Sequence, residues 1–279
     1  MALKLMYITN RPEVAQIAES AGVDRIFVDL EYIGKADRQG GMDTVQSRHT
    51  LEDVKRISES IQAAELLVRV NPIHDATAQY GSSEDEINAA IENGADILML
   101  PFFKRVDEVR RFLRAVDGRA KTMLLLETPE AVEIVDDILR LDGIDSIHIG
   151  LNDLSLGYGK KFMFEPLAEG LVETLCSKFR KAGIAYGFGG IAALGKGMIP
   201  AEMVIMEHYR LGSTCAILSR SFCNVDKIDH LGVIASTFID GLLEIRAFED
   251  KCVSTDSGSF EDNRLEFARR VKEICGGIL

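Results

Sequence analysis

Short apolar runs alternate along the chain with longer stretches in which apolar residues recur at helical spacing. Runs such as LMYI, ILML and MLLL are almost continuously apolar, which is typical of strands covered on both faces in a parallel sheet. The stretches between them have one apolar and one polar face, as amphipathic helices do. The pattern therefore predicts repeated strand–helix units.

The predicted strands are residues 3–8, 25–31, 66–70, 97–101, 122–127, 146–150, 185–188 and 215–218. The helices predicted to follow them are residues 11–21, 51–63, 83–93, 106–116, 129–141, 166–182, 200–211 and 227–249. Eight such units in succession predict an α/β fold of the (β/α)8 TIM-barrel type. A doubly wound open sheet is the alternative, but the glycine-rich fingerprint expected after its first strand is missing.

The predicted barrel occupies residues 1–251 as one domain. Residues 252–279 are surplus to it and are expected to form an additional C-terminal helical tail, with a linker-like segment to 262 and a charged helix at 263–274. This tail is expected to pack on its own barrel or on a neighbouring subunit. A homo-oligomer is therefore a hypothesis at this stage.

Composition narrows the functional classes. The chain has 279 residues, of which 47% are hydrophobic, so it can bury a core and is not disordered. Its net charge of −12 argues against nucleic acid or an anionic membrane as a partner, but not against a small anionic substrate. Five cysteines without a CxxC pair argue against a zinc site or a disulfide framework. Neither a signal peptide nor a membrane helix is evident, and we expect a cytoplasmic protein.

Polar residues gather where the predicted strands end, which is where barrel enzymes place their active sites. Glu127 and Asp153 end adjacent strands, which in a parallel sheet lie about 5 Å apart. Two carboxylates there can share one divalent cation, and the shortage of other protein ligands suits Mg²⁺ or Mn²⁺. The alternative is that Glu127 pairs with Arg69 and that Asp153 caps a helix.

The spacing of these motifs resembles the HpcH/HpaI aldolase and citrate lyase β-subunit superfamily. The resemblance rests on LLETPEAV at 125–132 and GLNDLS at 150–155, with Glu127 and Asp153 separated by 26 residues. The segments DLE at 29–31, LVRVNP at 67–72 and GADILMLP at 94–101 are similar to further motifs of that superfamily. The likeness spans roughly residues 10–220 and is strongest from 94 to 157.

The resemblance implies an enzyme that stabilises the enolate of a pyruvate-like 2-oxo acid. Glu127 and Asp153 would hold Mg²⁺ or Mn²⁺, and Arg69 would donate hydrogen bonds to the keto oxygen. Glu31 would reach the metal through water or orient Arg69. The backbone N–H groups of Leu151, Asn152 and Asp153, in a turn after the sixth strand, would bind the substrate carboxylate.

The chain departs from the family pattern after the second strand. Tyr32 stands where the aldolase branch commonly has a histidine for acid–base work. His49 is the first candidate to replace it, and His74 is the second. A long polar loop at residues 33–48 follows Tyr32 and contains Arg38 and Arg48. We expect this loop and Tyr32 to bind an anionic or hydroxyl-rich substrate tail.

Three further features bear on the mechanism. No lysine ends a core strand and the nearest is Lys104, which disfavours a Schiff-base mechanism. Arg220 at the end of the eighth strand is a candidate for binding a substrate carboxylate or phosphate, the alternative being a salt bridge. The segment GFGG at 187–190, with Gly195 and Gly197, predicts a flexible loop after the seventh strand, a weak signal for phosphate binding.

The leading hypothesis is a metal-dependent carbon–carbon lyase of the aldolase type, acting on a 2-oxo acid and an aldehyde or acyl partner. A citrate-lyase-like activity on a CoA thioester is the first alternative, because the RVNP segment resembles that branch. A catalytically inactive metabolite-binding barrel is the second, supported by Tyr32 in place of histidine. A synthase that condenses an oxo acid with a different partner is also compatible with the residues.

Overall fold

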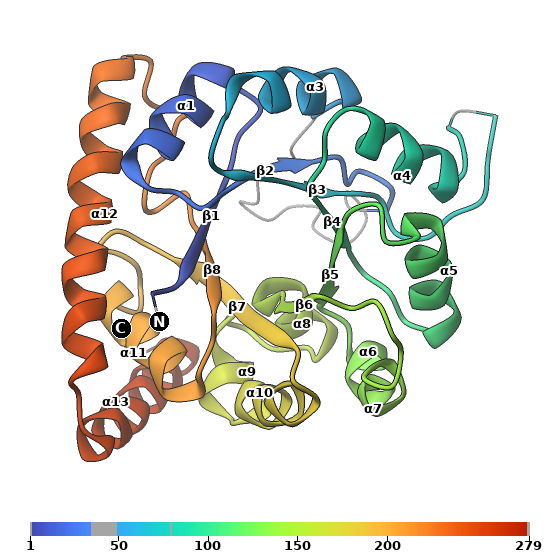
Figure 1. The fold of residues 1–279 in the computed structure, drawn as a ribbon. Helices are drawn as coiled ribbons and strands as arrows, with labels where there is room; N and C mark the ends of the chain where they lie inside the picture. Colours follow the sequence, from blue (N-terminus) through green and yellow to red (C-terminus); the bar gives the residue numbers. More distant parts are fainter. Residues whose placement is uncertain (1, 35–48, 79, 278–279) are drawn as a thin grey trace.

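The chain forms a closed parallel barrel. The computed structural model describes residues 2–34, 49–78 and 80–277. Eight strands pair in sequence order, and the last strand pairs with the first, for example at Lys4 and Cys215. Figure 1 shows helices surrounding this barrel, which confirms the predicted TIM-barrel fold.

The strands are β1 (Lys4–Ile8), β2 (Arg25–Asp29), β3 (Glu65–Arg69), β4 (Ile97–Leu100), β5 (Lys121–Leu126), β6 (Ser146–Ile149), β7 (Ala185–Ile191) and β8 (Cys215–Leu218). The helices are α1 (Pro12–Ala21), α3 (Leu51–Ser60), α4 (Ser83–Glu92), α5 (Val106–Val116), α6 (Pro129–Glu133), α7 (Val135–Ile138), α8 (Leu151–Gly157), α9 (Glu165–Ala168), α10 (Leu171–Ala182), α11 (Ala201–Leu211), α12 (Leu231–Val253) and α13 (Ser257–Cys275).

The strands divide their side chains between two cores. Phe27, Met99 and Met123 pack together inside the barrel, whereas Val28 and Leu98 belong to the larger core beneath the helices. Successive strand residues point to opposite faces, so both sets are apolar and the strands appear as unbroken apolar runs in the sequence.

The glycine-rich segment after residue 186 belongs to a strand, so the predicted flexible loop is wrong for residues 187–190. Strand β7 continues to Ile191, and its pairing with β8 shifts register between Gly187 and Gly190. A Cβ on Gly187 would lie 2.2 Å from the carbonyl oxygen of Cys215. Glycine is needed there because the two backbones approach too closely for any side chain.

Two predicted helices are each divided in the structure. The segment predicted at 129–141 forms α6 and α7, which meet at Ile134. The segment predicted at 166–182 forms α9 and α10, separated by Gly170 with a φ of 86°. A positive φ is not compatible with a continuous right-handed helix, and periodicity alone does not reveal it.

The C-terminal tail is more helical than predicted. Asp256 accepts a hydrogen bond from the Ser259 N–H and begins α13 within the predicted linker. Figure 1 shows α13 running from the end of the long helix α12 back beneath the barrel. Phe267 is buried with its ring 5.6 Å from that of Phe164, and Asn263 donates to Glu207 at 2.9 Å. The tail thus has a place on its own barrel, and the homo-oligomer stays a prediction.

The described helices were also compared with what a bilayer requires. None of them combines the length and the apolar character needed to span a membrane.

Candidate active site at the barrel mouth

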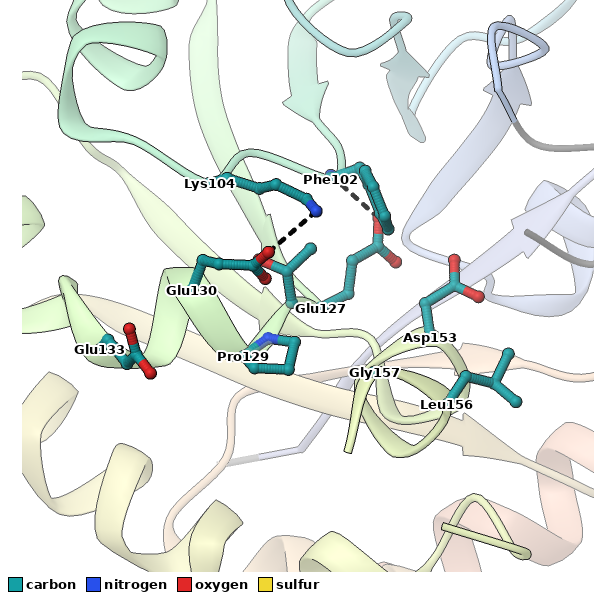
Figure 2. Close-up of a pocket in the computed structure, with 10 residues that line it drawn as sticks. Phe102, Lys104, Glu127, Pro129, Glu130, Glu133, Asp153, Leu156 and Gly157 are labelled. Carbon is teal, nitrogen blue, oxygen red and sulfur yellow. Dashed lines mark hydrogen bonds and ion pairs between the residues drawn. The ribbon is translucent and has the colours of Figure 1, made fainter. Parts of the chain in front are cut away.

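The ends of β5 and β6 bring two carboxylates to the mouth of the barrel. Leu126 pairs with Ile149, so these strands end side by side. Glu127 follows β5 directly, and Asp153 lies in the first turn of α8. Figure 2 shows both carboxylates turned toward the same space, whereas Glu133 lies farther away, at the end of α6. Their exposed fractions are only 4% and 8%.

The backbone holds Glu127 from two sides. The N–H of Phe102 donates to its Oε1 at 3.0 Å, and Phe102 adopts a φ of 50° to do so. Its Oε2 lies over Gly150, where a Cβ would approach to 2.7 Å. A non-glycine residue with positive φ is strained. The strain and the glycine both serve the placement of this carboxylate.

The donor set fits a hard divalent cation. Two buried carboxylates that face one hollow repel each other unless a positive charge lies between them. Within residues 2–34, 49–78 and 80–277, no three His, Cys, Asp or Glu side chains gather as a ready metal cluster. A cation held by Glu127 and Asp153 would complete its coordination with water and substrate oxygens, as Mg²⁺ and Mn²⁺ commonly do.

Arg69 ends β3 and faces the same region. Asp29 accepts from its Nε and its Nη2, each at 2.8 Å, and Oε2 of Glu31 lies 3.4 Å from Nε. Burial alone would lower the pKa of Arg69, but the charges of Asp29 and Glu31 outweigh it and raise the pKa. The guanidinium is therefore a permanent cation in a fixed orientation. Glu31 stands beside Arg69, as the orienting role requires.

One hollow of about 220 Å³ connects these groups. Arg69, Glu127 and Asp153 line it together with the backbone that leaves β6. His148 is part of its floor and contacts the Gly189 carbonyl oxygen at 3.1 Å. Burial lowers the pKa of His148 to about 4, so this ring is neutral near pH 7.

The segment that follows β6 is a helix start and not the predicted turn. Leu154 donates to the Gly150 carbonyl, which closes the first turn of α8. The N–H groups of Leu151, Asn152 and Asp153 precede that bond and have no acceptor within their own helix. Leu151 and Asn152 line the hollow, so the predicted carboxylate-binding role is still available to their backbones.

The two candidate acid–base histidines lie in different surroundings. Nδ1 of His49 accepts the Asp29 N–H at 3.0 Å, which places the ring proton on Nε2. His74 contacts the Pro72 and Gly81 carbonyl oxygens at 2.9 and 3.1 Å. Both ring nitrogens of His74 thus bind carbonyl groups of its own loop. His49 is better placed for acid–base work, because it lines a hollow together with Arg69.

The remaining predicted substrate-binding residues are spread around the mouth. Tyr32 is 52% exposed, contacts the Tyr80 ring, and lines a neighbouring hollow with His74. Arg220 is exposed and lines another hollow, together with His49 and Arg69. Arg38 and Arg48 lie outside the described residues. Lys104 pairs with Glu130 at 2.9 Å on the far side of Glu127 (Figure 2).

Sequence reasoning missed two residues that shape the site. Phe102 follows Pro101 after β4, and nothing in its sequence context indicates a positive φ. Asn71 belongs to the RVNP segment, and its Oδ1 accepts the N–H groups of Tyr32 and Ile33, each at 2.9 Å. A polar Asn directly after a buried strand could have been noticed in the sequence, but its hydrogen-bond partners, Tyr32 and Ile33, could not.

Known proteins resemble this chain in sequence and in fold. A family model described as HpcH/HpaI aldolase/citrate lyase matches residues 4–187. A 2-keto-3-deoxy-L-rhamnonate aldolase of Escherichia coli is 22% identical over 211 residues, covering 64% of this chain and 71% of that protein.

Solved structures share the fold at lower identity. An HpcH/HpaI aldolase from Desulfitobacterium hafniense has a TM-score of 0.59 and 18% identity, covering 78% of this chain and 86% of that one. An HpcH/HpaI aldolase/citrate lyase family protein from Burkholderia cenocepacia has a TM-score of 0.58 and 16% identity, covering 88% and 94%.

The family match and the aldolase relative support an enzyme of the lyase class. Because the match covers most of the barrel, including β3, β5 and β6, the chain belongs to the HpcH/HpaI aldolase/citrate lyase family.

Proposed function

We propose that the protein is a divalent-cation-dependent aldolase that breaks or forms a carbon–carbon bond to the enolate of a pyruvate-like 2-oxo acid. One observation carries this proposal: the Arg69 guanidinium lines the same hollow as the buried Glu127 and Asp153 carboxylates. A 2-oxo acid presents adjacent carboxylate and keto oxygens, which match a cation beside a fixed hydrogen-bond donor.

Glu127 and Asp153 would hold Mg²⁺ or Mn²⁺. When bound, the cation supplies positive charge to the oxygen on which the enolate charge develops. Gly150 and the Phe102 N–H keep the Glu127 carboxylate in position before any ligand arrives. Electrostatic stabilisation of a developing negative charge is strongest when the charged groups do not have to move during the reaction.

Arg69 would donate to the keto oxygen. Asp29 occupies its Nε and Nη2, so among the described contacts Nη1 is the nitrogen left to face the substrate. Asp29 and Glu31 act as positioning residues because they fix the guanidinium plane. The N–H groups of Leu151 and Asn152 would bind the substrate carboxylate.

In the cleavage direction, the bond between C3 and C4 breaks and its electron pair becomes the enolate. The C4 hydroxyl proton passes to a base, and a proton added at C3 completes the 2-oxo acid. His49 can take the C4 proton only after its hydrogen bond with Asp29 opens. The synthesis direction runs the same steps in reverse, so the group that takes the C4 proton in cleavage is the one that returns it to the aldehyde oxygen.

Calorimetry of pyruvate binding to chelator-stripped protein tests the proposal. We expect binding that requires Mg²⁺ or Mn²⁺ and that is lost in Glu127→Gln and in Asp153→Asn. The matched control is Glu133→Gln, because Glu133 is an exposed glutamate farther along the hollow drawn in Figure 2, so it tests whether any nearby carboxylate would serve. Binding that is indifferent to the cation and to both carboxylates would contradict the proposal.

A further inference from the structure

One half-buried carboxylate near the barrel mouth, that of Glu86 on α4, has no part in the proposed reaction. Its Oε2 accepts the backbone N–H of Asn71 at 3.1 Å, and its Oε1 accepts Nδ2 of Asn71 at 2.7 Å. Burial raises the pKa of Glu86, whereas the two hydrogen bonds from Asn71 and the nearby His74 ring oppose this rise. Among the described residues no lysine or arginine pairs with Glu86, so its negative charge acts on Asn71.

Glu86 determines which way the Asn71 amide faces. A carboxylate only accepts hydrogen bonds, so it requires the Nδ2 side of the amide and leaves Oδ1 on the opposite side. There Oδ1 accepts the N–H groups of Tyr32 and Ile33, each at 2.9 Å. Nδ2 also donates to the Leu30 carbonyl oxygen at 3.2 Å. If the amide were reversed, donors would face donors and acceptors would face acceptors, and these bonds would be lost.

The Asn71 amide thereby holds the peptide groups on both sides of Glu31. The Leu30 carbonyl precedes Glu31 and the Tyr32 N–H follows it, and Asn71 binds both groups. The Glu31 side chain is buried, and its Oε2 lies 3.4 Å from Nε of Arg69. The place of Glu31 beside Arg69 therefore depends on the orientation of the Asn71 amide.

We propose that Glu86 is a positioning residue for the enolate site. It acts through Asn71, which fixes the backbone around Glu31, and Glu31 in turn contacts the Arg69 guanidinium. The inference rests on the proposed function, in which Arg69 donates to the keto oxygen. Glu86 acts from a distance, because it lines a different hollow from Arg69.

An exchange of chemical groups between positions 71 and 86 tests this arrangement. In Asn71→Asp two carboxylates face each other, and in Glu86→Gln one amide donor meets another, so each single variant loses hydrogen bonds. In the double variant the amide at position 86 can donate to the carboxylate at position 71, which can still accept from Tyr32 and Ile33. The matched control is Glu92→Gln, because Glu92 is an exposed glutamate at the end of the same helix.

The main readout is exchange of the pyruvate methyl protons in D₂O with Mg²⁺, measured over a range of pyruvate concentrations to separate kcat from KM. We expect Glu86→Gln to lower kcat by about tenfold and Asn71→Asp to lower it further, because small misplacements at a reacting centre are costly. KM should change much less than kcat, since the lost interaction is strongest in the transition state. Glu92→Gln should leave both quantities unchanged.

The double variant separates positioning from a general loss of structure. We expect its kcat to return to within about threefold of the wild type, because the two changes compensate each other. Urea unfolding of all variants gives the folded fraction to which kcat is referred. Wild-type kcat in Glu86→Gln, or a double variant that is no more active than Asn71→Asp, overturns the proposal.

Failure of this proposal and failure of the proposed function give different results. Pyruvate exchange that occurs in the wild type and is unchanged in Glu86→Gln means that only the positioning role is wrong. If the wild type shows no pyruvate exchange, the aldolase proposal fails. Amide hydrogen exchange of the Tyr32 and Ile33 N–H groups, which needs neither pyruvate nor a cation, then still decides whether Glu86 holds this backbone in place.

Discussion

The two edges of the barrel mouth differ in charge, in burial and in how firmly their side chains are held. At the β5–β6 edge, Glu127 and Asp153 are acidic and 4% and 8% exposed, and the backbone fixes Glu127. At the β8–β1 edge, Arg11 and Arg220 lie together with Asp226, and both Arg220 and Asp226 are exposed. The acidic edge is therefore the buried one, and the edge of mixed charge is open to solvent.

The family match covers the β5–β6 edge fully but only the β1 side of the β8–β1 edge. It ends at residue 187, so it includes the ends of β3, β5 and β6 but not β8. The lyase assignment therefore concerns the acidic edge, and Arg220 lies beyond it.

Arg69→Lys should produce the largest effect on the rigid edge. Lysine keeps the charge, but its single side-chain nitrogen cannot donate to both oxygens of Asp29 and also to the substrate. Loss of a preorganised donor to a developing oxyanion typically costs about a hundredfold to a thousandfold in kcat. Steady-state kinetics with pyruvate and an aldehyde measures this loss. Arg111→Lys, which alters an ion pair with Glu84 outside the mouth, serves as the control.

Gly150→Ala should have the next largest effect. The added methyl group would meet Oε2 of Glu127 at 2.7 Å and push the carboxylate out of place. We expect kcat/KM to fall by about tenfold or more, because small misplacements at a reacting centre are costly. Gly232→Ala meets only the His230 side chain and should leave kcat/KM unchanged. Equal activity in the two alanine variants would show that the Glu127 position is not critical.

The smallest effect concerns folding stability and two buried histidines, His148 on β6 and His208 on α11. His148 and His208 are buried, and burial lowers their pKa values to about 4 and about 3. Above pH 6.5 both states are neutral, so folding stability does not depend on them. Below that pH only the unfolded chain binds their protons, and the free energy of unfolding falls by about 1 kcal/mol per histidine between pH 7 and 5.5.

Urea unfolding of the wild type and His208→Gln at these two pH values measures this difference. The His208 ring stacks on Phe188 at 3.9 Å, and its Nε2 is buried with no partner among the described residues. The variant should be less stable at pH 7 but lose less on acidification, because one of the two neutral histidines has been removed. An identical loss in both proteins would mean that His208 is not held neutral.

The fold was predictable because strands that are buried on both faces leave a strong pattern in the sequence. The two carboxylates were predictable for a related reason, since they stand directly after such strands and the rule for barrel mouths then brings them together. Positions that depend on backbone conformation were not predictable. Phe102 donates to Glu127, and Gly187 approaches Cys215, so both positions depend on segments that are distant in the sequence. The break at Gly170 is a local positive φ that helical spacing does not reveal.

The role of His49 shows the same limit. The sequence placed it near a helix start as an acid–base candidate, which remains a prediction. Only the structure shows that the Asp29 N–H occupies its Nδ1, because residues 29 and 49 are separated by a long segment of chain. Which nitrogen carries the proton is set by a tertiary contact and has no counterpart in the sequence pattern.

Exchange of the C3 protons of pyruvate in D₂O, followed by proton NMR, tests most directly the claim that Glu127 and Asp153 hold a cation for enolate formation. We predict exchange that requires Mg²⁺ or Mn²⁺, that is lost in Glu127→Gln and in Asp153→Asn, and that persists in Glu133→Gln. Exchange that continues without the cation and in both carboxylate variants, or no exchange in the wild type under any of these conditions, would contradict the account.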